Sequence, residues 1–104
     1  MNLKNVFVNL LFFVMVCIGH SQTATIQGVI LDANNEPISN VNIKANSIPI
    51  AIGTETNDNG FYLLKIPANQ DVKIEFTHLS HKNVISTFNL KNGETYEFNP
   101  VMSI

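Results

Sequence analysis

The chain has 104 residues, a formal net charge of −2 and no arginine. A chain of this length suggests a single domain. Because arginine supplies the planar fork that grips phosphates and bases, a mildly acidic chain without it is a poor candidate for binding nucleic acid or anionic lipid.

The first 21 residues have the order of a secretory signal. Lys4 is the only charge in this segment, every residue from Leu10 to Ile18 is apolar, and the small residues Gly19 and Ser21 follow. A secretory signal has a positively charged start, then a short apolar run, then small residues just before the site that signal peptidase cleaves. The apolar run is shorter than the roughly 20 residues that a membrane-spanning helix needs. We therefore predict a cleaved signal over residues 1–21 and no membrane span in the mature chain.

The predicted cut lies between Ser21 and Gln22, so residues 22–104 form the mature, exported domain. One alternative is an uncleaved N-terminal anchor. Another is a lipid anchor on Cys17, although Val16 is larger than the residue that usually precedes a lipidated cysteine. The chain has no other cysteine, so disulfides do not stabilise the mature domain after export.

Short runs of alternating apolar and polar residues, separated by residues typical of turns, make up the rest of the chain. We predict about seven strands, at residues 25–31, 41–45, 54–56, 61–66, 72–77, 84–90 and 96–102. The clearest turn is the Asn-Asp-Asn-Gly sequence at 57–60, where glycine can adopt positive φ. This spacing indicates an all-β, antiparallel sandwich in which each sheet has one face in water. The predicted core includes Ile43, Leu64, Ile74 and Phe76.

Four segments, in chain order, resemble a known family. They are an opening strand and turn from Gly28 to Asp32, a proline turn and alternating strand from Glu36 to Ile43, a hairpin from Gly53 to Leu63, and a later strand and bend from Ile74 to Lys82. The family is the carboxypeptidase regulatory-like domain, a transthyretin-like (prealbumin-like) β-sandwich. The resemblance covers residues 25–102. In the bend, the family usually has glycine followed by an aromatic residue, where this chain has Ser80 and His81.

The residues that carry the resemblance have architectural roles. Gly28 leaves room on an apolar face for something bulky. Pro37 fixes φ where its turn ends, and Tyr62 brings a large ring with a polar tip to the edge of the sandwich. The full set of structural motif residues is Gly28, Pro37, Val41, Ile43, Thr56, Gly60 and Tyr62.

Candidate catalytic and metal-binding groups are sparse. His78 and His81 form an H-x-x-H pair, but residues i and i+3 of a strand point to opposite faces, and no third ligand has a suitable spacing. The turn at 57–60 lacks the further oxygen ligands of a calcium loop. Glu55 and Asp58 lie on a strand and a turn with no sign of a pocket for glycosidase chemistry. We expect no enzyme activity, no bound metal and no cofactor.

The resemblance implies a function by association. Such domains often precede the plug of a TonB-dependent outer-membrane receptor, and they also follow the catalytic domain of some metallocarboxypeptidases. We expect a non-catalytic accessory or interaction domain in the periplasm or at the outer membrane, a truncated or stand-alone version of a receptor's N-terminal extension. Its partner would be a protein, such as a receptor or its plug and barrel. The alternative is a secreted module that recognises carbohydrate or peptide through its loops.

We expect docking at an exposed strand edge, where backbone donors and acceptors are free to pair with another chain. The last predicted strand is our choice because it ends where a partner domain would begin. This places the docking edge at Tyr96, Glu97 and Phe98.

Overall fold

The computed structural model describes residues 22–46 and 51–104, and these residues form strands and turns without a helix. The predicted signal, with Cys17, lies outside the described residues. No helix of the described part is long and apolar enough to cross a membrane. The strands are β1 (Thr23–Val29), β2 (Asn42–Asn46), β3 (Ile52–Glu55), β4 (Phe61–Pro67), β5 (Val72–His78), β6 (His81–Phe88) and β7 (Thr95–Glu97).

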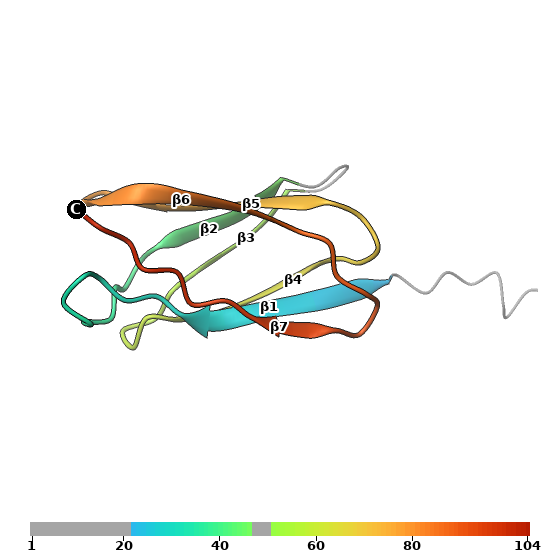
Figure 1. Ribbon diagram of the computed structural model, residues 1–104, viewed down its shortest axis with the longest axis horizontal. Helices are drawn as coiled ribbons and strands as arrows, with labels where there is room; N and C mark the ends of the chain where they lie inside the picture. Colours follow the sequence, from blue (N-terminus) through green and yellow to red (C-terminus); the bar gives the residue numbers. More distant parts are fainter. Residues whose placement is uncertain (1–21, 47–50) are drawn as a thin grey trace, which may run out of the picture.

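The seven strands form two stacked sheets, as Figure 1 shows. One sheet has three strands in the order β4-β1-β7, and the other has four in the order β3-β2-β5-β6. The predicted all-β sandwich is therefore confirmed. Because successive side chains of a strand point to opposite faces, each strand with alternating apolar residues turns one row inward and the other toward water.

Strand β7 departs from the prediction of wholly antiparallel sheets. It runs parallel to β1, with Thr25 opposite Thr95 and Gln27 opposite Glu97. After β6 the chain crosses from the four-stranded to the three-stranded sheet and enters at the end where β1 begins (Figure 1). A tight hairpin would force the two strands to be antiparallel, whereas a crossover between sheets does not.

Each strand's bounds also shift from the predicted ones by one or more residues, and the largest shifts are at β6 and β7. Strand β6 begins at His81, within the predicted bend, because the connection to β5 is only two residues long. Strand β7 ends at Glu97 rather than at residue 102. Beyond it the chain stays beside the extension of β1 through a single bridge between Leu31 and Val101.

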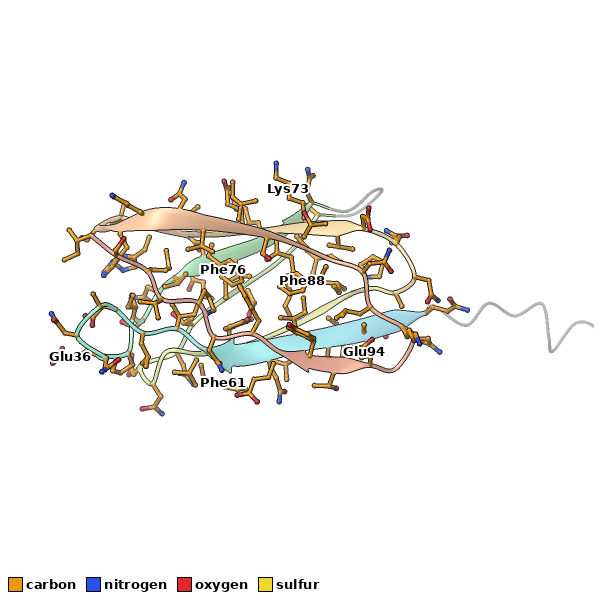
Figure 2. The ribbon with its side chains drawn as sticks, viewed as in Figure 1. Glu36, Phe61, Lys73, Phe76, Phe88 and Glu94 are labelled. Atoms are coloured by element: carbon orange, nitrogen blue, oxygen red, sulfur yellow. The ribbon has the colours of Figure 1, made fainter. Side chains whose placement is uncertain are left out.

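The core lies between the sheets and is rich in aromatic rings. Figure 2 shows Phe76 and Phe88 between the two layers. Tyr62 meets Phe76 edge-on, with ring centroids 5.6 Å apart, and Phe88 meets Phe98 at 5.1 Å. Such edge-to-face pairs add to the stabilisation from burial alone. The predicted core residues are all buried: Ile43, Leu64, Ile74 and Phe76.

Asparagine and aspartate side chains shape the turns. The Oδ1 atom of Asn57 accepts hydrogen bonds from the amides of Asn59 (2.9 Å) and Phe61 (3.0 Å), and Gly60 has a φ of 74°. A Cβ at Gly60 would lie 2.7 Å from the carbonyl oxygen of Ile30. The turn between β3 and β4 therefore requires glycine both for its backbone angle and for its close approach to the neighbouring chain.

Thr56 is a buried polar residue that ties two segments together. Its Oγ1 accepts from the amide of Val41 (2.9 Å) and donates to the carbonyl of Ile38 (2.7 Å). Its own amide donates to the carbonyl of Val41 (3.1 Å). Pro37, just upstream, bridges to Leu31. The turn that leads into β2 is thus fixed by the side chain of the residue that follows β3, and the buried hydroxyl is satisfied.

Gly28 and Tyr62 together anchor the segment after β7. A Cβ at Gly28 would lie 2.0 Å from the carbonyl oxygen of Phe98, so the bulky group over this glycine is backbone. The hydroxyl of Tyr62 donates to that same carbonyl oxygen (2.6 Å), and the amide of Phe98 donates to Gln27 (2.9 Å). Tyr62 is buried, and burial raises the pKa of its phenol far above the ordinary value.

Candidate docking surface

The predicted docking edge, β7, is an edge strand of the three-stranded sheet. Its three predicted residues face different surroundings. Tyr96 is partly exposed but packs against Phe88, with ring centroids 5.6 Å apart. Phe98 turns inward and packs against Phe76 and Phe88, so its side chain does not belong to the edge. Glu97 is exposed, and its carboxylate accepts a hydrogen bond from the side-chain amide of Asn99 (3.2 Å).

The backbone of Glu97 is free to bind another strand. The amide of Phe98 donates to Gln27, and the amide of Thr25 donates to Glu94 (2.8 Å). Because hydrogen-bonding groups alternate in direction along a strand, the N–H and C=O of Glu97 point away from β1. A carboxylate on an edge strand discourages indiscriminate strand pairing. The free edge is short, since β7 has only three residues.

A second surface, the outer apolar patch, lies on the face of the three-stranded sheet that points away from the core. We define it as Val29, Phe61, Leu63 and Val101, which are between 36% and 59% exposed. Phe61 pairs directly with Val29, and Leu63 lies one pleat further along β4. Figure 2 shows Phe61 outside the sandwich, pointing away from the opposite sheet. The bridge to Leu31 brings Val101 beside the extension of β1, and Met102 next to it is buried.

The outer apolar patch was absent from the sequence prediction. The sequence pattern that could have revealed it is the run Phe61-Tyr62-Leu63-Leu64, four large apolar residues in a row. A strand with one wet face should alternate instead. Tyr62 and Leu64 fill the core, so Phe61 and Leu63 must lie on the outer face. The neighbours of Phe61 and Leu63 on β1 are Val29 and Gln27.

The two histidines lie together, contrary to the prediction that they point to opposite faces. His78 ends β5, His81 begins β6, and the two-residue turn between them makes them partners across the hairpin. The i, i+3 rule holds within one strand and fails where the chain reverses. Their Nδ1 atoms are 2.9 Å apart. Within the described part of the chain, no group of three or more histidine, cysteine or acidic residues could hold a metal ion.

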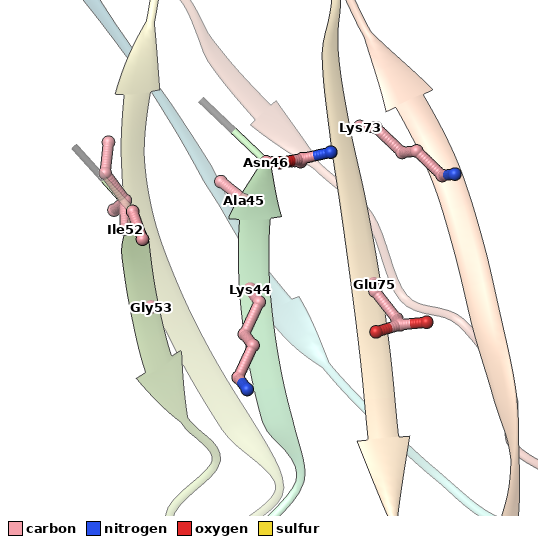
Figure 3. Close-up of a pocket in the computed structure, with 8 residues that line it drawn as sticks. Lys44, Ala45, Asn46, Ile52, Gly53, Lys73 and Glu75 are labelled. Atoms are coloured by element: carbon pink, nitrogen blue, oxygen red, sulfur yellow. The ribbon is translucent and has the colours of Figure 1, made fainter. Parts of the chain in front are cut away.

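A shallow hollow of about 450 Å³ lies on the outer face of the four-stranded sheet (Figure 3). Gly53 leaves space beside Lys44, whose neighbour on β5 is Glu75. Lys73 and Asn46 lie further along the same face. The lining thus offers two amines, one carboxylate and one amide above small apolar groups. Among these described residues there is no nucleophile beside a base.

The two stacked sheets, in the orders β4-β1-β7 and β3-β2-β5-β6, and the aromatic core between them form a transthyretin-like β-sandwich module. The sequence match agrees with this class: the model of the CarboxypepD_reg-like domain matches residues 26–103. The chain therefore belongs to the carboxypeptidase regulatory-like domain family. A search of curated protein sequences finds no significant relative.

Solved structures share the fold at low sequence identity. The chain is similar to the Bacillus anthracis TIE protein (TM-score 0.66, 13% identity), and the match covers 79% of this chain and 16% of that protein. It is also similar to 3-chlorocatechol 1,2-dioxygenase from Rhodococcus opacus (TM-score 0.64, 8% identity), covering 84% of this chain and 62% of the enzyme. It is similar as well to a streptococcal ancillary pilin (TM-score 0.59, 8% identity), and the match covers 82% of this chain and 33% of the pilin. At these identities the likeness concerns the sandwich alone.

Proposed function

We propose that this protein is a non-catalytic docking domain of the cell envelope, comparable to the N-terminal extension of a TonB-dependent receptor, and that its partner is another protein. The observation that carries the proposal is the outer apolar patch. An isolated exposed apolar residue is ordinary, but a contiguous group on one sheet face is typical of an interaction site. The patch joins Val29, Phe61 and Leu63 by strand register and extends to Val101.

The surroundings of the patch favour a protein partner over a lipid surface. On the same face lie Gln27 and Glu97, which are paired neighbours, and the exposed Lys65. Protein interfaces combine an apolar centre with such a polar rim of both charges. A membrane surface with anionic lipids would instead favour a cluster of basic residues around the apolar group. The absence of arginine from the whole sequence agrees with this choice.

The free edge of β7 adds a second means of contact beside the patch. Glu97 presents an outward N–H and C=O at the border of the same sheet, so a partner strand that pairs there would also lie near the outer face. Strand addition supplies affinity through main-chain hydrogen bonds, and side-chain contacts supply specificity. The patch and the edge therefore form one continuous docking surface in this proposal.

Localisation in the envelope rests on the signal-like residues 1–21 and on the family resemblance. The mixed, mildly acidic surface gives no competing indication of a nucleic-acid partner. The set of exposed groups also lacks the convergent nucleophile, base and oxyanion donors that an enzyme site combines, within the residues described.

The test is capture of a partner by cross-linking in an envelope fraction, compared between matched variants. Leu63→Ser removes one exposed apolar side chain from the patch. Ile85→Ser removes an exposed one from β6, on the outer face of the other sheet. We expect Leu63→Ser to lose most of the capture and Ile85→Ser to retain it. Glu97→Pro should also weaken capture, while Glu97→Ala should not, because only proline removes the amide.

Equal capture by Leu63→Ser and Ile85→Ser, with both variants folded, would contradict docking through the patch. The enzyme alternative has its own readout. If the purified protein hydrolysed a peptide, ester or glycoside, and the activity followed the protein through purification, the non-catalytic assignment would be wrong.

A further inference from the structure

The hairpin between β5 and β6 brings two imidazoles into contact. Leu79 and Ser80 form its turn and are exposed, while His78 and His81 on either side are half-buried. The two rings lie edge to face, with centroids 4.7 Å apart and an interplanar angle of 69°. Their Nδ1 atoms are 2.9 Å apart, which is hydrogen-bond distance.

The neighbouring amide determines which ring carries the proton between them. The amide of Ser80 donates to Nδ1 of His78 at 3.1 Å, so this nitrogen is an acceptor. The hydrogen between the rings therefore belongs to Nδ1 of His81, and His78 carries its own hydrogen on Nε2. One hydrogen therefore lies between the two nitrogens, next to the exposed turn of Leu79 and Ser80.

We propose that His78 and His81 form a two-imidazole site for a divalent transition-metal ion, Cu²⁺ above all, in which the metal replaces the bridging proton. In a square-planar or tetragonal site, cis nitrogens at about 2.0 Å from the metal lie about 2.8 Å apart, against about 3.3 Å in a tetrahedral zinc site. The observed 2.9 Å shows that the two nitrogens already lie within the span of two cis ligands of one metal ion. Among divalent first-row ions, Cu²⁺ also binds nitrogen donors most strongly.

The exchange is balanced without a redox step. The proton on Nδ1 of His81 moves to Nε2 of the same ring through solvent, which frees the second lone pair for the metal and releases no net proton from two neutral rings. A modest rotation of both rings aims the lone pairs at a common point. The amide of Ser80 loses His78 as its acceptor and is hydrated instead, since the turn is exposed.

The surroundings leave coordination positions open on the metal. Glu55, Asn40 and Asn42 line a depression that also includes His78, and Glu55 adds negative charge beside the site. Glu55 is not close enough to complete a three-ligand group with the two histidines in the described part of the chain. Water or a ligand from another molecule would therefore fill the remaining positions.

The experiment is a Cu²⁺ titration of the protein, purified after expression of the full-length chain and treated with a chelator. Calorimetry gives stoichiometry and affinity, and electron paramagnetic resonance reports the number of bound nitrogens. Binding at the terminal amine is distinguished because it persists in the histidine variants described below. We expect one Cu²⁺ per chain, coupling to two imidazole nitrogens, and an affinity for Zn²⁺ at least tenfold lower.

The variants His78→Asn and His81→Asn should each weaken Cu²⁺ binding at least tenfold and remove the two-nitrogen signal. Ser80→Ala, which changes the exposed turn residue between the two histidines and keeps its backbone amide, is the matched control and should bind as the parent protein does. Melting curves in chelator verify that each variant is folded, which is expected because the pair lies at an exposed hairpin end. Absence of stoichiometric Cu²⁺ binding, or binding unchanged in both hairpin variants, would overturn the proposal.

Discussion

Gly28→Ala is the substitution that most directly probes how the C-terminal segment is held. An added Cβ would lie 2.0 Å from the carbonyl oxygen of Phe98 and 2.8 Å from its carbonyl carbon. These are backbone atoms, so no side chain can rotate away. Relief requires the chain at Phe98 to move by more than an ångström, since ordinary contact between carbon and oxygen begins near 3.4 Å.

The cost follows from what that movement breaks. Overpacking of a close contact costs about 1–3 kcal/mol. The segment also holds hydrogen bonds from Phe98 to Gln27 and from Tyr62 to Phe98, each contributing about 1 kcal/mol net. Replacing glycine by alanine offsets about 0.5–1 kcal/mol of this loss, because alanine lowers the conformational entropy of the unfolded chain. We expect a net loss of about 2–4.5 kcal/mol in the free energy of unfolding, a large fraction of the total for a domain of this size.

Urea denaturation followed by circular dichroism measures this loss, and Gly53→Ala is the control. At Gly53 the built Cβ has one close neighbour, the carbonyl oxygen of Ile43 at 3.2 Å, so the strain is small. We expect Gly53→Ala to stay within about 1 kcal/mol of the parent protein. If Gly28→Ala proved as stable as Gly53→Ala, the anchoring of the Phe98 segment over β1 would be wrong.

Three further predictions follow from the core and the chain start. Phe76→Ala should cost about 3–5 kcal/mol because the ring is fully buried between Tyr62 and Phe98; a mild effect in urea denaturation would place the ring elsewhere. Tyr62→Phe should cost about 1 kcal/mol at neutral pH. Because burial raises the pKa of Tyr62, the phenol's contribution to the free energy of unfolding is intact below its unfolded pKa of about 10 and is lost as pH rises above that value. Melting curves of Tyr62→Phe should lack this loss of stability at alkaline pH. Identical dependence of melting temperature on alkaline pH in the parent protein and in Tyr62→Phe would contradict it. Mass spectrometry of the exported protein should find a start at Gln22, whereas a start at Cys17 with added lipid mass would favour the anchor.

Local patterns were sufficient to predict the sandwich. The alternation in residues 41–45 and 72–77 identified the inward rows of β2 and β5 correctly, and Asn57 with Gly60 identified the turn before β4. These features depend on neighbours in sequence, because strand period and turn chemistry are local properties.

The remaining features depend on contacts between distant segments. The parallel direction of β7 results from a crossover between sheets, and no sequence pattern within residues 95–97 predicts that direction. The inward turn of Phe98 follows from the anchor made by Gly28 and Tyr62. The meeting of His78 and His81 depends on a reversal of only two residues, whereas the sequence suggested a wider bend there.

The central claim, docking through the outer apolar patch, is tested most directly by residue-specific photo-cross-linking in intact cells. A photoreactive amino acid replaces Leu63 in the patch or Lys73 on the opposite outer face, which Figure 2 shows pointing away from the sandwich. The account predicts a discrete adduct with one envelope protein from position 63 and none from position 73. The same adduct from both positions, or no adduct from position 63, would contradict it.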